Sequence, residues 1–348
     1  MKKSVVWMAM LVAAGMMWGA NGAKVVVLPQ LYGPNDIAVD EERIYITQRA
    51  TIFIFARDDY RLMGRFGKKG EGPGEFKLGD DNTVYLAVRA DDLIVNSVGR
   101  ISYFNKDGKF IKERINTAGL WLEPLGTKFV GMKRQYEEDN TRYRKIYIYN
   151  ANLEKGKEIY REFDGIQPRL KIIEAVTWPS SWIYNVGDGK IFVANKEETI
   201  HVFDEQGDKL YDIRIPYKRI KVTPAIKEKY LRYYREVEPY WRARWERLKG
   251  WYRFPDYLPV IQYYVVKDGH LYVLTYREQE GKSEFLVLDE KGNLIQAVYV
   301  NIKREGSSAF NVYPFDIKDN TIYQLVDNAD TEQTELHIIT IKAIQKER

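Results

Sequence analysis

The feature that most constrains this chain is an internal repeat, a polar turn followed by a short alternating apolar segment. The repeat occurs six times in 348 residues, over residues 42–46, 91–95, 126–130, 188–193, 268–273 and 319–323. The residues before each turn, such as 36–39, also alternate in most units, so each unit is expected to begin as a β-hairpin. Units of this size cannot bury an apolar face alone and must stack on one another.

A second alternating segment follows each hairpin and ends in another polar turn, as in residues 200–203 before Asp204 and 285–288 before Asp289, except that the last instance, residues 336–339, has no Asp-Gly turn after it. A fourth strand follows in most units. Four antiparallel strands repeated about six times predict an all-β fold, a six-bladed β-propeller. The last unit lacks room for a fourth strand, and residues 25–28 are expected to supply it and close the ring. An open sandwich or two smaller barrels are the alternatives.

The N-terminal residues are predicted to be a signal rather than part of the fold. Lys2 and Lys3 precede an apolar run from Val5 to Trp18, and short residues follow up to Gly22. This pattern is typical of a secretory signal peptide, here residues 1–22, and leaves residues 23–348 for the propeller. The run is shorter than the ~20 residues of a spanning helix, although an uncleaved anchor is the alternative. The sequence has no cysteine, so a periplasmic or secreted bacterial protein without disulfides is expected.

One loop carries a family resemblance. Residues 64–76 read Gly-Arg-Phe-Gly-Lys-Lys-Gly-Glu-Gly-Pro-Gly-Glu-Phe. This segment resembles a signature of secreted bacterial six-bladed β-propellers related to the NHL-repeat group, where such a loop joins the outer strand of one blade to the next blade. The resemblance implies a fold and a compartment more than an activity. In physical terms, the glycines allow unusual backbone angles, and Phe76 is expected to anchor the loop between two blades.

Between units four and five, at about residues 223–254, the period becomes helical. Thr223 is a suitable N-cap and Pro224 a suitable first residue, and Pro239 should end the first of two helices. The stretch from Lys218 to Arg253 holds twelve basic and four acidic residues, a net charge of +8. Without Lys2 and Lys3 the whole chain carries only +3, so the remainder is about −5.

The helical insertion supplies the candidate partner-binding residues. They are Arg232, Arg235, Trp241, Arg242, Arg244 and Trp245. Aromatic rings bind sugar faces, and guanidinium groups bind carboxylates. The partner would be a protein or glycan of the cell envelope, with an anionic membrane surface as a further possibility. In the alternative, the aromatic stripe packs on the propeller and the basic face is solvated. No nucleic-acid partner is expected because of the secretion signal, and a monomer is expected.

Catalytic motifs are scarce. The three histidines, His201, His270 and His337, have no zinc-ligand spacing, and no catalytic residue can be assigned. Some related propellers are lactonases or lyases with metal ligands at the central channel. Here the candidate metal ligands are Asp36, Asp80 and Asp316, near the starts of inner strands, where a hard cation such as calcium takes carboxylate oxygens. In the alternative these are turn residues.

These observations favour a non-catalytic binding or scaffold propeller of the bacterial cell envelope, with no obligatory cofactor. The alternative is a metal-assisted, lactonase-like hydrolase or lyase with its site at the central channel. A purely structural component of an envelope complex is the third possibility.

Overall fold

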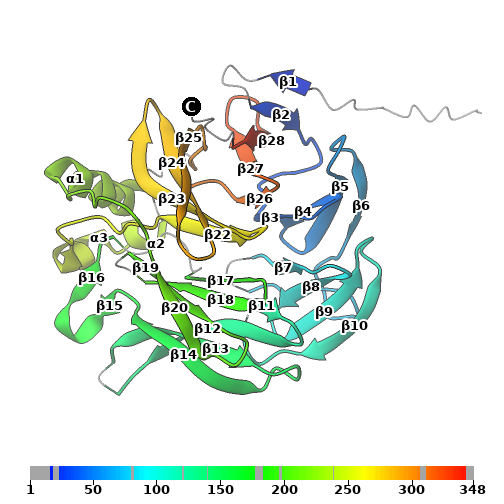
Figure 1. The fold of residues 1–348 in the computed structure, drawn as a ribbon, viewed down its shortest axis with the longest axis horizontal. Helices are drawn as coiled ribbons and strands as arrows, with labels where there is room; N and C mark the ends of the chain where they lie inside the picture. The colour runs from blue at the N-terminus through cyan, green and yellow to red at the C-terminus, as the bar shows by residue number, and fades with distance from the viewer. Residues whose placement is uncertain are drawn as a thin grey trace, which may run out of the picture.

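The computed structural model describes residues 16–18, 23–79, 82–119, 121–138, 140–176, 183–195, 198–237, 239–305 and 311–341. Most of these residues lie in β-strands, and the few helices are short. The strands form seven sheets, and Figure 1 shows the larger ones standing around a common axis in a propeller-like arrangement. The first strands of neighbouring sheets contact one another around this axis, as β26 does with β3 and β17 with β22.

Five sheets are antiparallel meanders of four consecutive strands. The first sheet holds β3 (Asp36–Val39), β4 (Arg43–Gln48), β5 (Thr51–Ala56) and β6 (Leu62–Phe66), and the second β7 (Tyr85–Val88), β8 (Asp92–Ser97), β9 (Arg100–Asn105) and β10 (Phe110–Ile115). The third holds β11 (Leu122–Leu125), β12 (Lys128–Tyr136), β13 (Arg142–Tyr149) and β14 (Lys155–Phe163). The fourth holds β17 (Tyr184–Gly187), β18 (Lys190–Ala194), β19 (Thr199–Phe203) and β20 (Lys209–Arg214), and the fifth β22 (Tyr263–Lys267), β23 (His270–Gln279), β24 (Lys282–Asp289) and β25 (Leu294–Val300).

The sixth large sheet joins the two ends of the chain. It holds β26 (Phe315–Lys318), β27 (Thr321–Asn328) and β28 (Gln333–Thr340), and its fourth strand is the N-terminal β2 (Lys24–Val27). Strand β2 pairs antiparallel with β28, with Val26 opposite Leu336, which confirms the expected closure by the N-terminal segment. A short strand β1 (Met16–Trp18) pairs with the free edge of β2. The rest of the predicted signal peptide lies outside the described residues.

The seventh sheet is small and was not expected from the sequence. It consists of β15 (Ile166–Gln167), β16 (Ile172–Glu174) and β21 (Tyr252–Arg253). Its residues come from the connection between the third and fourth large sheets and from the end of the helical insertion. Ile173 lies opposite Tyr252 in a parallel pair, so the small sheet ties two long connections together.

The helical insertion follows β20 and precedes β22. It contains α1 (Pro224–Arg232), a π-helical turn η2 (Tyr233–Val237), α2 (Pro239–Arg242), α3 (Trp245–Leu248) and the 3-10 turn η3 (Lys249–Trp251); a 3-10 turn η1 (Pro168–Leu170) precedes β16. The Thr223 side chain accepts a hydrogen bond from the backbone N–H of Ile226 at 3.3 Å, so it caps α1 as its sequence position indicates.

Because the large sheets are antiparallel meanders, their loops fall on two faces. Turns between the first and second strands, and between the third and fourth, lie on one face, which we call the turn face. The other loops, including the long ones between sheets and the insertion, lie on the opposite face, the connection face. Ion pairs join adjacent sheets across the turn face, including Lys106 to Asp40 at 2.7 Å and Lys318 to Asp268 at 2.6 Å. Each such pair contributes little stability, about 0–1 kcal/mol, but fixes the relative position of two sheets.

The repeated outer turn explains how one sheet seats against the next. In three sheets this turn ends in a glycine with positive φ, namely Gly108, Gly207 and Gly292. An added Cβ there would lie 2.3, 2.5 and 2.6 Å from Phe66, Ile159 and Ile213 respectively. Each of these side chains belongs to the outer strand of the preceding sheet. The glycine therefore serves both the turn and the close approach of its neighbour.

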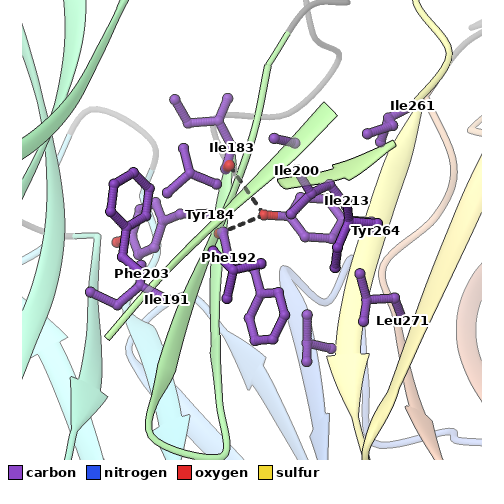
Figure 2. Close-up of a cluster of buried hydrophobic side chains, with 14 of the residues drawn as sticks. Ile183, Tyr184, Ile191, Phe192, Ile200, Phe203, Ile213, Ile261, Tyr264 and Leu271 are labelled. Atoms are coloured by element: carbon purple, nitrogen blue, oxygen red, sulfur yellow. Dashed lines mark hydrogen bonds between the residues drawn. The ribbon is translucent and has the colours of Figure 1, made fainter. Parts of the chain in front are cut away.

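Buried tyrosines form a second link between sheets. Tyr264 of β22 is 2 % exposed, and its hydroxyl donates to the Phe192 and Ile183 carbonyls of the preceding sheet at 2.8 and 3.2 Å (Figure 2). Tyr184 of β17 reaches the Trp121 carbonyl in the same manner at 2.7 Å. Because a buried hydroxyl needs a partner, these bonds satisfy the tyrosines while the surrounding apolar side chains fill the space between sheets.

The glycine-rich loop over residues 64–76 connects β6 to β7, between the first and second sheets. Phe76 is fully buried in the apolar cluster between these sheets, as its position in the sequence indicated. An added Cβ at Gly67 would lie 2.4 Å from the Phe76 ring, so this position must be small. The Glu75 carboxylate accepts from the Gly72 N–H at 2.9 Å and pairs with Lys68 at 2.8 Å. The loop is a packed crossover.

We expect Gly292→Ala to lower the free energy of unfolding by about 2–4 kcal/mol, because strain at φ +87° adds to the overlap with Ile213. Gly269→Ala is the matched control, since Gly269 has φ +72° but no heavy atom within 4 Å of an added Cβ. It should lose only about 1–2 kcal/mol. Urea denaturation measures both, and equal losses would show that the approach of Ile213 does not limit packing.

Val26→Thr should destabilise the protein by about 1–3 kcal/mol, because it buries a hydroxyl without a partner at a fully buried position of the closing strand. Val27→Thr, on the same strand but partly exposed, should lose less than about 1 kcal/mol. Thermal unfolding followed by circular dichroism checks the pair. A neutral Val26→Thr would mean that β2 does not hold the ring closed.

Candidate functional site

A pocket of about 460 Å³ lies on the axis of the large sheets. Its walls come from the first strand of all six large sheets, that is β3, β7, β11, β17, β22 and β26. A second pocket of about 340 Å³ opens toward the connection face. The two pockets are adjacent, since they share Asp36, Tyr85, Tyr263 and Phe315 in their walls, and we call them together the axial hollow. Its size is typical of small-ligand sites.

Acidic side chains on the pocket wall link adjacent first strands. Asp316 Oδ2 accepts from the Val39 N–H at 2.8 Å, and Glu123 accepts from the Val186 N–H at 2.8 Å. Each donor belongs to the first strand of the next sheet, whose edge toward the axis has no strand partner. These carboxylates therefore satisfy backbone donors that would otherwise be unpaired in the wall.

The candidate ligands Asp36 and Asp316 lie near each other beside Lys267. The Lys267 ammonium is 3.0 Å from Asp316 Oδ2, and the second Asp316 oxygen accepts from the Ile317 N–H at 2.8 Å. From the residues that the structure describes, Asp36 accepts a single hydrogen bond, from the Ile37 N–H at 2.9 Å. Burial, with a smaller effect of the Asp316 charge, raises the pKa of Asp36 to about 6. Asp316 thus has both oxygens engaged, whereas Asp36 keeps one oxygen available.

Glu123 is the second carboxyl group of this pocket whose pKa is strongly raised. Burial raises its pKa to about 7, against the opposing effects of the Val186 hydrogen bond and the Lys267 charge. Tyr263 lies close enough to Asp36, Asp316 and Glu123 for their charges to raise the pKa of its hydroxyl, although burial is the larger cause. Its ring contacts Phe315 at a centroid distance of 5.0 Å. The pocket thus combines aromatic rings with two carboxyl groups whose pKa values are raised by burial.

Among the described residues, no group of three or more histidines and carboxylates is arranged to hold a metal ion. Asp80, the third predicted ligand, lies outside the described residues. The positive charge next to Asp316 is supplied by Lys267. Each of the three histidines instead makes a local hydrogen bond. His201 bonds to Asp212 and His337 to Glu335, both at 2.7 Å, and His270 bonds to the Asp268 backbone carbonyl.

The six candidate partner-binding residues separate into two groups in the structure. Trp241 and Trp245 are half-buried in a cluster that joins the insertion to the small sheet, where Trp245 stacks on Tyr252 at 5.8 Å. Arg235 is engaged as well, since it pairs with Glu236 at 2.7 Å and with Glu228 at 3.2 Å. These three residues shape and hold the insertion.

The other three candidates are available at the surface. Arg232 and Arg242 are exposed, and Arg244 is partly exposed. Within the described part of the chain, Arg242 donates to the Glu236 carbonyl at 3.3 Å and makes no ion pair. The Arg244 guanidinium lies 3.9 Å from the centre of the Tyr240 ring, a ring that is itself 54 % exposed. The surface of the insertion is therefore basic with an aromatic component.

The insertion borders the mouth of the axial hollow. The Asn311 side chain donates to the Tyr233 hydroxyl at 3.4 Å, and Asn311 lines the pocket on the connection face. Helix α1 also packs on the fifth sheet, because Tyr230 belongs to an apolar cluster that includes Tyr276. The pocket mouth and the basic insertion thus belong to one face of the molecule.

Glu123, Lys267 and Tyr263 were not among the candidates from the sequence. A comparison of equivalent positions in the six repeat units could have identified such residues. Glu123 is the second residue of its first strand, as Asp316 is of β26. An alignment of the six units would have placed Glu123 with Asp316, but the spacing between units is too irregular for that alignment by inspection.

No family model and no curated protein matches the sequence. Several solved structures are weakly similar to this chain. One is a computationally designed protein, Ika8, with 10% sequence identity and a TM-score of 0.38; the match covers 94% of this chain and 83% of Ika8. BBS1N, in a complex with ARL6DN, has 12% identity, 92% and 88% coverage and a TM-score of 0.37. BamB from Moraxella catarrhalis has 9% identity, 90% and 81% coverage and a TM-score of 0.33. Such low similarities carry no functional argument.

No helix in the described ranges is long and apolar enough to cross a membrane.

Glu123→Gln should stabilise the protein at pH 8 but not at pH 4. Between an unfolded value near 4.5 and the folded pKa of about 7, the folded state binds more protons, so the Glu123 contribution to stability falls as pH rises through this window. The gain at pH 8 should be about 1–3 kcal/mol. It is smaller than the full pKa difference implies, because Glu123 is only partly buried and water screens its charge. Urea denaturation at both pH values tests this, with exposed Glu332→Gln as control. An equal gain at both pH values would indicate a packing effect.

Proposed function

We propose that this protein is a six-bladed β-propeller of the bacterial cell envelope that binds a glycan without transforming it. The six large sheets are the blades, and the small sheet is an accessory of the connection face. The support for six is that the axial pocket takes its wall from the six large sheets, whereas none of its described lining residues comes from β15, β16 or β21. The glycine-rich loop and the N-terminal pattern favour a secreted protein similar to the NHL-related propellers.

The observation that carries the binding proposal is the axial hollow with its mouth beside the insertion. Sugars present hydroxyl donors and apolar ring faces. Asp36 and Glu123 each keep an oxygen that accepts no hydrogen bond within the described part of the chain. Tyr263 and Phe315 supply rings nearby. A few placed polar groups among aromatic walls are what small-ligand sites use to orient a ligand.

The experiment is a titration of the purified full-length protein against neutral, acidic and amino-sugar oligosaccharides by isothermal calorimetry. We expect one class to bind, and the Asp36→Asn/Glu123→Gln double variant to bind it at least about tenfold more weakly, the loss of two charge-assisted hydrogen bonds. Asp330→Asn/Glu332→Gln removes the same charge from an exposed turn and should leave the affinity unchanged. Equal weakening in both doubles, or no binding of any class, would contradict the proposal.

A metal-assisted hydrolase or lyase is the second candidate. It is favoured by two carboxyl groups that line one pocket, Asp36 and Glu123, with pKa values of about 6 and about 7, because such values suit general acid and base catalysis. Elemental analysis of protein purified without chelator separates the two functions. Near-stoichiometric calcium that is lost in Asp36→Asn would favour this candidate, and turnover of a lactone substrate would establish it.

A further inference from the structure

The helical insertion, residues 218–253, carries a positive charge that its own carboxylates do not neutralise. Arg219, Arg235 and Lys249 pair with acidic side chains. The remaining cations that have no carboxylate within 4.0 Å among the described residues are Lys218, Lys221, Lys227, Arg232, Arg242, Arg244, Arg247 and Arg253. Most of these are exposed arginines and lysines, so a strongly basic surface faces the solvent.

The apolar side of the insertion is already used for packing. Tyr230 is 4 % exposed and Leu248 is 6 % exposed, and both tryptophans contact the small-sheet cluster. The exposed Tyr240 ring is covered on one side by Arg244. A helix that docks into a bilayer keeps its apolar face free for the lipid. In the insertion this apolar face already packs against the propeller. This favours a soluble, negatively charged partner over a lipid bilayer.

We propose that the insertion binds the backbone of an anionic glycan polymer, with its arginines paired to regularly spaced carboxylates. This inference rests on the proposed function in one respect, that the partner is a glycan, and it adds the chemistry of the polymer. The guanidinium fork matches a carboxylate with two hydrogen bonds. Because the insertion borders the pocket mouth through Tyr233 and Asn311, a chain held by the arginines can present one end to the axial hollow.

The test uses polygalacturonate as the anionic polymer and its fully methyl-esterified form as the neutral match. Wild-type full-length protein should bind the acid form at low salt, and its affinity should fall as salt is added. It should not bind the methyl ester. Arg232→Gln/Arg242→Gln/Arg247→Gln removes three cations that make no side-chain ion pair among the described residues. This variant should bind at least about tenfold more weakly.

The matched control is Arg65→Gln/Lys69→Gln/Lys112→Gln, three exposed cations in β6, in the loop that follows β6, and in β10. Strands β6 and β10 lie across the molecule from α1 (Figure 1). It removes the same net charge and should change the affinity less than about twofold. Equal weakening by both triples would overturn the proposal, because net charge alone would then explain binding. Circular dichroism confirms that both variants fold.

Three further outcomes also decide between the proposals. Stronger binding to phosphatidylglycerol vesicles than to polygalacturonate at equal charge concentration would overturn the glycan in favour of a bilayer. The Asp36→Asn/Glu123→Gln variant separates this inference from the pocket: polymer binding that survives in it supports the insertion site even if the pocket proposal fails. Absence of polymer binding in wild type, with oligosaccharide binding intact, would leave the pocket standing and reject the insertion site.

Discussion

The pairing of β2 with β28 is the constraint on which the rest of the structure depends. Without it, β28 would present an open edge, and the apolar space between the sixth and first large sheets would lose Val26 and Leu28 from its wall. Unpaired edges invite association with other chains, and the pairing with β2 covers the edge of β28 by joining the two ends of one chain. The glycine turns and the buried tyrosines then have fixed neighbours, because each seats one sheet against the sheet before it.

The same closure determines the chemistry of the axis. First strands have no strand partner on their inner side, so backbone N–H groups point toward the hollow. Glu123 and Asp316 accept two of these donors, and Asn185 accepts a third from Val266 at 3.4 Å. Polar side chains are therefore required at the axis for structural reasons, and their burial is what shifts the pKa of Glu123. The candidate site is thus built from groups that the architecture already needs.

Local patterns predicted most of the strands, the capped helix at Thr223, the buried Phe76 and the closing role of residues 25–28, because each depends on nearby side-chain alternation or turn chemistry. The small sheet was missed, since strands of two and three residues in separate connections leave no periodic signal. Trp241 and Trp245 were candidate partner contacts, but the small sheet gives them a packing role. The sequence did not predict that all six large sheets line the pocket, nor that Glu123 lies near Lys267. Both depend on how the units are placed in space, and the spacing along the chain does not reveal this placement.

The sheet that unites residues 24–27 with residues 335–338 also sets an order of events during folding. Contacts so distant in sequence carry a large loop-closure entropy and form slowly. The first five sheets can fold as local meanders while the chain is still being made, but the ring stays open until β28 is available to pair with β2. During that interval β2 lacks its partner β28 and exposes an edge at which another copy of the chain could pair.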